Sequence, residues 1–91
     1  MLKIEYTTRF KRDLKLAKKR NKNIENLQVI MNKIVQEEKL NQRFRDHPLS
    51  GNWNGHRELH IEPDWLLIYK IIQKEEVVIF VRTGTHADLF H

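Results

Sequence analysis

Three histidines stand out in this 91-residue chain because each lies in a short polar segment beside other reactive groups. His47 lies in DHPL, His60 in HIEPDW and His86 in RTGTH, and the last two segments also include Asp64 and, just before Thr83, Arg82. An imidazole with an unperturbed pKa of roughly 6.5 can accept or donate a proton near neutral pH. Arginine adds a permanent cation that binds phosphate through a planar fork. This set of side chains suits cleavage of a phosphodiester bond without a metal ion.

A metal site is the main alternative use of these histidines. His56 and His60 are four residues apart, which is a zinc-binding spacing on a helix. In an extended strand the same spacing separates two residues by about 13 Å, too far for one ion. The chain also has no cysteine and no HExxH motif. We therefore expect neither a catalytic metal nor a disulfide.

The positive charge of the chain is concentrated at its N-terminal end. Residues 1–22 contain nine Lys or Arg and two acidic residues, whereas residues 23–91 contain eight and ten. A basic patch of this kind attracts a polyanion. The charge alone is equally consistent with a solvated helix face, so nucleic-acid binding stays open at this point.

The first third of the chain predicts a short strand followed by two amphipathic helices. Residues 3–6 form the strand, and Thr7 or Thr8 can cap the first helix. Its apolar stripe, and that of a second helix after Asn23, recur at helical spacing; the stripes consist of Phe10, Leu14 and Ala17, and of Ile24, Leu27, Met31, Ile34 and Val35. The short connection favours antiparallel packing of the two helices.

The last third is extended. Strands are expected over residues 55–61, 65–72 and 77–83, separated by the turn at 62–64 and by polar residues 73–76. We predict a single domain over residues 1–91 of the α+β class, with the order β-α-α-β-β-β. The strands form an antiparallel sheet, and the two N-terminal helices pack on one of its faces.

Strand alternation predicts which side chains reach the open face of the sheet. In the last strand Val77, Ile79 and Val81 would face the core, and Val78, Phe80 and Arg82 would point away from the helices. Arg82 would then share one rim of the open face with the histidines. Each residue also has a purely structural interpretation: His47 can shape a loop, Asp64 a turn, and Arg82 can pair with a carboxylate.

The longest apolar runs, residues 65–69 and 77–81, are far too short to span a membrane. The first residues also lack the apolar core of a signal peptide. We therefore expect a cytoplasmic protein.

The chain resembles the YafQ-like branch of the RelE toxin superfamily, the ribosome-dependent mRNA interferases of bacterial toxin–antitoxin pairs. The resemblance runs from about residue 4 to residue 90. It is densest in KLAKKR (15–20), in DHPL (46–49) with Gly51 and Trp53, in residues 60–70, and in RTGTHA (82–87) with Leu89 and Phe90. It implies the RelE-like β-α-α-β-β-β fold, in agreement with the reading above.

The resemblance also implies a role for each site residue. The catalytic residues are His47, His60, Asp64, Arg82 and His86, and the residues that contact the nucleotide are Trp65 and Phe90. His86 would be the general acid and Arg82 would bind the phosphate. His60 and Asp64 would lie on the side of the base, with His47 assisting either proton transfer. No cofactor is implied.

The implied partners are mRNA in the decoding site, the ribosome and an acidic, partly disordered antitoxin. Ribosomal RNA would be held by the basic residues of the first helix, namely Lys11, Arg12, Lys15, Lys18, Lys19 and Arg20. Three rival functions remain: a non-enzymatic ParE-like gyrase poison, a plain RNA-binding module and a metal-dependent hydrolase. The His/Asp set speaks against the first, since a gyrase poison needs no acid–base residues.

Overall fold

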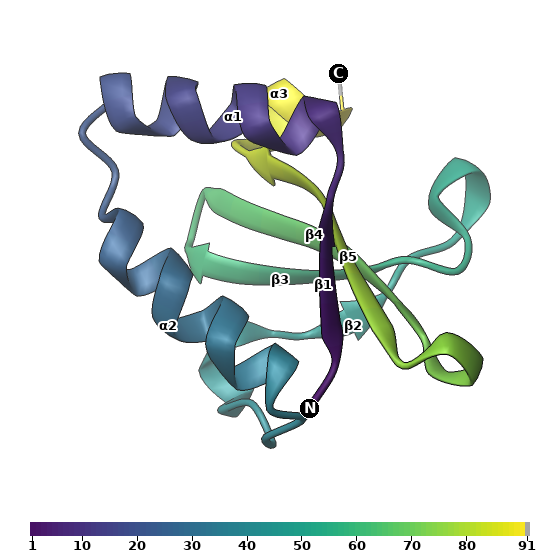
Figure 1. The fold of residues 1–91 in the computed structure, drawn as a ribbon. Helices are drawn as coiled ribbons and strands as arrows, with labels where there is room; N and C mark the ends of the chain where they lie inside the picture. Colours follow the sequence, from purple (N-terminus) through teal and green to yellow (C-terminus); the bar gives the residue numbers. More distant parts are fainter. Residues whose placement is uncertain (91) are drawn as a thin grey trace.

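The computed structural model describes residues 1–90 as one five-stranded sheet with two long helices on one face (Figure 1). The strands are β1 (Lys3–Tyr6), β2 (His47–Pro48), β3 (Arg57–Glu62), β4 (Trp65–Ile72) and β5 (Val77–Gly84). The helices are α1 (Thr8–Lys19), α2 (Ile24–Val35) and the short α3 (His86–Phe90), with 3-10 turns at Gln42–Phe44, Gly51–Trp53 and Gln73–Glu75. None of these helices has the length and apolar character needed to cross a bilayer.

The sheet has the strand order β1-β5-β4-β3-β2. The expected meander of β3, β4 and β5 is confirmed, and β2 extends it by antiparallel pairing with β3. β1 pairs with β5 in parallel, so the sheet is mixed rather than wholly antiparallel. β2 and α3 fall where the sequence predicted a loop and a tail, because neither short segment has a periodic apolar pattern of its own.

Both long helices begin at the expected caps. The Thr7 hydroxyl accepts a hydrogen bond from Phe10 N–H at 2.9 Å, and the Asn23 side chain accepts one from Asn26 N–H at 3.2 Å. The predicted antiparallel pairing of the two helices is wrong. α1 lies across one end of the sheet, and the axis of α2 runs at a steep angle to that of α1 (Figure 1). Each helix packs its apolar stripe on the sheet instead of on its neighbour.

Apolar side chains form a cluster on each face of the sheet. The larger cluster joins the helices to the strands, and its fully buried members include Phe10, Leu27, Leu59, Leu67 and Phe80. A smaller cluster on the opposite face consists of Leu66, Ile68 and Leu89, with Leu49, Trp53 and Val81 packed around it. The helices therefore leave part of this second face open, as expected.

The alternation predicted for β5 is wrong, because Val78 and Phe80 belong to the helix-side core. A bulge between the pairs Tyr69–Phe80 and Ile68–Arg82 then adds one residue, Val81, to the strand. Directly opposed residues of an antiparallel pair share a face. Through the bulge, rather than through regular alternation, Arg82 therefore pairs with Ile68, but its guanidinium turns to Asp13 of α1 instead of extending over the open face.

Candidate active site

Histidines from three separate elements line up on the open face of the sheet. The ring centroids of His47 (β2) and His60 (β3) lie 6.4 Å apart, and those of His60 and His86 (α3) lie 5.7 Å apart. Phe90 follows, with its ring 6.4 Å from that of His86. The predicted convergence of the three imidazoles is confirmed. We call His47, His60 and His86 the histidine row.

Sheet register places these side chains together. His47 stands opposite Glu58, His60 opposite Leu66, and Leu66 opposite Gly84. The chain turns into α3 two residues beyond Gly84, and the buried Leu89 holds this helix over the open face. A side chain at position 84 would be tightly crowded, since a Cβ there would lie 3.0 Å from two atoms of Asp88, which would have to move slightly. The glycine therefore allows α3 to fold back close to β5.

Glu58 is part of the site, although we did not predict it from the sequence. Its side chain is 7% exposed, and Oε1 lies 3.6 Å from His47 Nε2 and 3.5 Å from His60 Nε2. These distances correspond to ion-pair contacts with either imidazole when it is protonated, rather than to strong hydrogen bonds. The spacing of Glu58 and His60 in β3 carried the signal, since residues two apart in a strand share a face.

A neighbouring backbone group orients the ring of His47. His47 Nδ1 lies 2.6 Å from the carbonyl oxygen of Arg45, so Nδ1 is the donor and Nε2 faces Glu58. The preceding residue, Asp46, accepts hydrogen bonds from Tyr69 Oη at 2.5 Å and from Arg57 Nη2 at 3.2 Å. These contacts attach the segment before β2 to β3 and β4. Burial, and after it the hydrogen bond to Asp46, raises the pKa of Tyr69. The loop that carries His47 is therefore held at two points.

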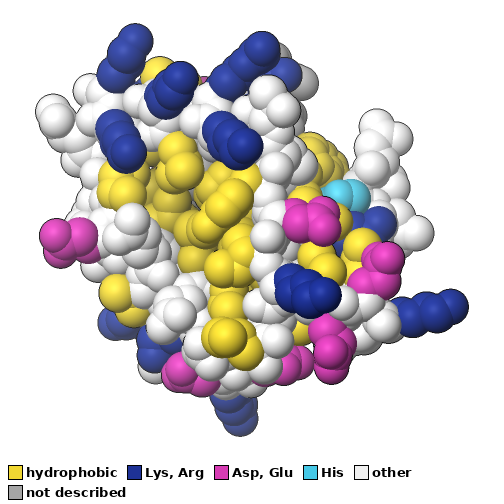
Figure 2. Space-filling view, in the orientation of Figure 1, with side chains coloured by type: hydrophobic (Ala, Val, Ile, Leu, Met, Phe, Trp, Pro, Cys, Tyr) yellow, Lys and Arg dark blue, Asp and Glu magenta, His cyan; other side chains and the backbone are white. Residues whose placement is uncertain are grey.

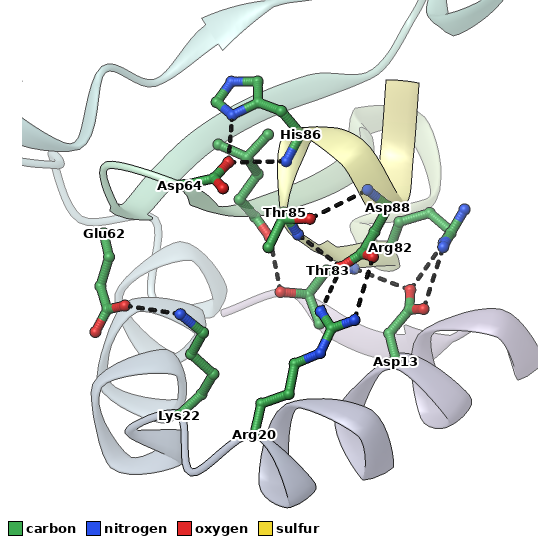
Figure 3. A network of polar contacts seen from close by, with 11 residues as sticks. Asp13, Arg20, Lys22, Glu62, Asp64, Arg82, Thr83, Thr85, His86 and Asp88 are labelled. Atoms are coloured by element: carbon green, nitrogen blue, oxygen red, sulfur yellow. Dashed lines mark hydrogen bonds and ion pairs between the residues drawn. The ribbon is translucent and has the colours of Figure 1, made fainter. Parts of the chain in front are cut away.

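Asp64, in the turn between β3 and β4, binds His86 rather than His60 (Figure 3). Its Oδ1 accepts the backbone N–H of His86 at 2.9 Å and lies 2.6 Å from Nδ1 of the same residue. The backbone hydrogen bond, followed by that from the ring, lowers the pKa of Asp64. With Nδ1 bonded to Asp64, His86 presents Nε2 for chemistry. Both groups are exposed, at 53% and 65% of the side chain, so a substrate can reach them.

A reciprocal cap fixes the start of α3. Thr85 N–H donates to Asp88 Oδ2 at 2.9 Å, and Asp88 N–H donates to the Thr85 hydroxyl at 3.1 Å. This is a capping box at the N-terminus of the helix. Arg20, the C-cap of α1, reaches the same carboxylate at 2.7 Å (Figure 3), and the pKa of Asp88 falls to about 2, chiefly through this contact. α3 is therefore attached to α1 as well as to the sheet.

The Arg82 guanidinium points to α1, although Arg82 pairs with Ile68, whose side chain lies on the open face. Nε lies 2.8 Å and Nη2 3.2 Å from the carboxylate of Asp13, which also accepts Thr83 N–H at 3.1 Å (Figure 3). The expectation that this side chain points away from the helices is wrong, because Asp13 on α1 lies within its reach at the edge of the sheet. Within residues 1–90 the hydrogen bonds of the guanidinium to Asp13 use Nε and Nη2, and Nη1 has no hydrogen-bond partner.

The two predicted nucleotide-contacting aromatics differ in position. Trp65 is 1% exposed in the helix-side core, so it cannot stack on a nucleotide in this structure, and that prediction is not supported. Its apolar ring is buried with the helices because β4 alternates into both clusters. Phe90 is 42% exposed beside His86, and Trp53 meets it edge-on at 6.3 Å. Phe90 is therefore the aromatic ring available at the site.

The basic residues of α1 form a row along one side of the molecule, seen in dark blue at the top of Figure 2. All six predicted members are exposed: Lys11, Arg12, Lys15, Lys18, Lys19 and Arg20. Among residues 1–90 only Arg20 of this set takes part in an ion pair. The charges of the other five are exposed to solvent, where a polyanion can contact them.

The side chains of the histidine row are not arranged as a metal site. Within residues 1–90 no three His, Asp or Glu side chains are grouped closely enough to hold one ion. Glu58 lies between His47 and His60 instead, and Asp64 binds His86. The arrangement thus offers proton donors and acceptors at both ends of the row.

Comparison with known proteins identifies the family. Residues 2–91 match the model of the family described as the bacterial toxin of type II toxin–antitoxin systems, YafQ. The chain belongs to the YafQ toxin family. The match covers α1, the sheet and α3, so every element that builds the site lies within the family domain.

Related YafQ-family proteins share both sequence and structure with this chain. The mRNA interferase toxin YafQ of Escherichia coli K12 is 46% identical over 88 residues, which cover 96% of this chain and 94% of the relative. A chain in the crystal structure of the E. coli DinJ–YafQ complex matches with a TM-score of 0.91 and 42% identity, over 100% of this chain and 100% of that one. A metal-bound toxin from Helicobacter pylori matches with a TM-score of 0.93 and 37% identity, over 99% of this chain and 100% of that one. The RelE-like α+β fold is thereby confirmed.

Proposed function

We propose that this YafQ-family toxin is an mRNA interferase, a ribosome-dependent endoribonuclease that needs no metal ion and inhibits translation. The observation that carries the proposal is the histidine row, which ends in His86 bound to Asp64. Its members can take and give protons on either side of one phosphodiester. The E. coli relative that bears the name mRNA interferase toxin supports the same activity for this chain.

RNA supplies the nucleophile. A base at the His60 end of the row removes the proton from a 2′-hydroxyl, and the 2′-oxygen attacks the adjacent phosphorus. The bond from phosphorus to the 5′-oxygen of the next nucleotide breaks as the 2′,3′-cyclic phosphate forms. His86, protonated on both ring nitrogens, gives its Nε2 proton to the departing oxygen. The short distance between the two rings allows both transfers at the same phosphate.

Other side chains position and stabilise this reaction. Asp64 holds the ring of His86 through Nδ1, and Glu58 lies between His47 and His60. Arg82 supports negative charge on the phosphoryl oxygens through the part of its guanidinium that Asp13 does not occupy. Phe90 stacks on a base next to the cleaved bond, as exposed aromatic rings do in single-stranded RNA sites.

We further propose that α1 binds ribosomal RNA and that the toxin acts on mRNA in the ribosomal decoding site, in the cytoplasm. The exposed cations of α1 support the first part. The DinJ–YafQ complex supports a cognate antitoxin as the second partner. A bacterial cell that produces an active mRNA interferase needs such an inhibitor to grow.

The test is cleavage of a defined message on purified programmed ribosomes, with the 5′ and 3′ fragment ends mapped. We expect cleavage with a 2′,3′-cyclic phosphate end, unchanged by a chelator. His86→Ala should lower the rate by about 100-fold or more, as removal of a general acid does. His56→Ala is the matched control, since that ring lies against Trp53 and outside the histidine row. Gyrase inhibition without RNA cleavage, or loss of cleavage with the chelator, would contradict the proposal.

A further inference from the structure

A large groove opens beside His60, at the edge of the sheet that β2 leaves uncovered. It has a volume of about 1050 Å³ and lies between α2, residues 39–45 and the end of β3 with its following turn. β2 pairs only with Arg57 and Glu58, so β3 from Leu59 onward has no strand on this side. His60 is the one member of the histidine row that lines the groove. The groove is therefore continuous with the proposed catalytic site.

Uncompensated positive charge surrounds this groove. Lys39, Arg43 and Arg45 line it, are exposed, and form no ion pair within residues 1–90. Its carboxylate, Glu62, is already paired with Lys22 at 3.3 Å. Arg43 Cζ lies 4.9 Å from the centroid of the Phe44 ring, a cation–π contact that favours this position of its guanidinium. The groove thus presents a positive field with no free negative charge of its own.

The remaining lining of the groove is apolar. Val29 of α2, Leu40 and Ile61 contribute to it, and Val29 is 55% exposed. A groove that combines a cationic wall with apolar surface fits single-stranded nucleic acid, in which phosphates and base faces alternate along the chain. Its volume lies at the upper end of the range of small-ligand pockets, about 300–1,000 Å³, which leaves room for more than one nucleotide.

We propose that this groove binds the RNA segment on the 5′ side of the cleaved bond. The inference rests on the proposed function. The nucleotide whose 2′-hydroxyl reacts with the base at the His60 end lies upstream of the bond, and the leaving nucleotide lies at His86. The upstream strand therefore leaves the site beside His60, at the opening of the groove. Lys39, Arg43 and Arg45 neutralise its phosphates, whereas the downstream strand passes Phe90.

An acidic peptide would also match the charge of the groove, and continuity decides between the two occupants. A protein partner could bind a basic surface anywhere on the molecule. An RNA strand held at the histidine row must continue past one of its ends, and the end at His60 leads into the cationic groove. The groove is therefore assigned to the substrate of the same site.

The test measures binding of short RNAs to the wild-type protein by fluorescence anisotropy. Each RNA carries the cleavage site mapped on the ribosome, with a 2′-deoxy sugar at the reacting nucleotide to prevent cleavage. A core RNA is compared with versions lengthened by a few nucleotides at either the 5′ or the 3′ end. We expect the 5′ extension to tighten binding several-fold and to steepen its salt dependence by about 0.7 in log–log slope per new phosphate contact.

The double variant Lys39→Gln/Arg43→Gln should remove most of the gain from the 5′ extension and leave any gain from the 3′ extension unchanged. Loss of a phosphate contact weakens binding near 0.1 M salt by about fivefold. Lys3→Gln/Lys74→Gln is the matched control, because both residues are exposed and lie outside the groove lining. This control should bind all RNAs as the wild type does.

Three results would overturn the assignment. The first is a 5′ extension that does not change RNA affinity, and the second is a gain in affinity from this extension that persists in the groove variant. The third is a groove variant that no longer binds a poly-glutamate peptide, which the wild type binds, but still binds the 5′-extended RNA. The last result would give the groove to an acidic protein partner. Absence of cleavage on programmed ribosomes would instead reject the proposed function, so the two failures are distinguishable.

Discussion

Arg20 Nη1 lies 2.7 Å from Asp88 Oδ2, although 68 residues separate them in the chain. The contact joins the C-terminal end of α1 to α3, the helix that carries His86 and Phe90. A helix of only five residues is not stable by itself in water, so contacts from outside must hold it. The pair therefore links the helix proposed to bind the ribosome with the helix that carries the proposed general acid.

Replacement of Asp88 should affect cleavage more than stability. Asp88→Asn keeps the shape of the side chain but removes the charge that attracts Arg20. Because the ion pair is partly exposed and Asn can still accept the Thr85 N–H hydrogen bond, we expect a smaller loss of stability than from breaking a buried pair. Displacement of a catalytic group by about 1 Å can cost 100-fold in rate, so we expect cleavage to fall at least about tenfold. Cleavage rates and denaturant unfolding of the same protein check this.

Two further variants show whether the effect passes through α3. Amide hydrogen exchange in residues 85–90 should become faster in Asp88→Asn, and Arg20→Lys should restore more activity than Arg20→Gln. Glu75→Gln is the control, since this acid is exposed on the connection between β4 and β5. Unchanged exchange with reduced cleavage would show that Asp88 does not act by holding α3.

The same carboxylate predicts a dependence of stability on pH. The pKa of Asp88 is lowered from 3.8 to about 2 in the folded protein, mainly by Arg20. A group with a depressed folded pKa stabilises the fold above its unfolded pKa, and the contribution disappears as pH falls toward the folded value. The stability difference between wild type and Asp88→Asn should therefore be constant from pH 7 to about 5. It should shrink between pH 4 and 2, as measured by urea unfolding.

Glu58 should prove necessary for cleavage. Glu58→Gln preserves volume but removes the charge that lies within ion-pair distance of His47 and His60. We expect cleavage to fall by roughly 10- to 100-fold, because the two rings lose the group that orients them. The imidazole NMR signals of His47 and His60 should shift, while those of His56 stay in place. Full activity with shifted signals would limit Glu58 to a structural role.

Variants of Asp13 and Arg82 distinguish a structural from a catalytic function of Arg82. Their side chains are 9% and 14% exposed, and breaking such a pair typically costs about 3 kcal/mol. If Arg82 binds the phosphate, Asp13→Asn should be destabilised and still cleave when folded, whereas Arg82→Gln should lose cleavage as well. Rates measured at a temperature where both variants are fully folded check this. Equal losses of activity in the two variants would make the pair structural.

The sequence predicted most of the elements because local patterns specify them. The caps at Thr7 and Asn23 and the strand over residues 65–72 were found as expected. The parallel pairing of β1 and the bulge at Val81 were not, since both depend on contacts between segments far apart in the chain. The face assignment in β5 failed for the same reason, because alternation assumes a regular strand.

In the site, too, residue types were predictable from the sequence, whereas contacts between distant segments were not. His47, His60 and His86 were found by residue type and came together as predicted. Glu58, beside His47 and His60, and Asp13, the partner of Arg82, were not predicted, because a carboxylate acquires its role only when the fold brings it to a neighbour. Trp65 was expected near a nucleotide, yet a tryptophan in an apolar strand is usually buried, and burial prevailed here.

The exposed cations of α1 give the last prediction. Reversal of Lys15, Lys18 and Lys19 to glutamate should weaken ribosome association, because these side chains have no ion-pair partner within residues 1–90 and present their charge to solvent. Each lost phosphate contact should make the log–log salt dependence shallower by about 0.7–0.9. Ribosome pelleting over a series of salt concentrations measures both effects.

The control for α1 is the same number of reversals at Lys3, Lys70 and Lys74, which lie on β1, on β4 and after β4. This variant has the same net charge but leaves α1 intact, so a purely non-specific charge effect would weaken both proteins equally. We expect only the α1 variant to lose affinity with a shallower salt dependence. Its fold should persist, since none of the three α1 lysines is buried. Equal behaviour of the two variants would show that α1 is a solvated helix face and would leave ribosome recognition to another surface.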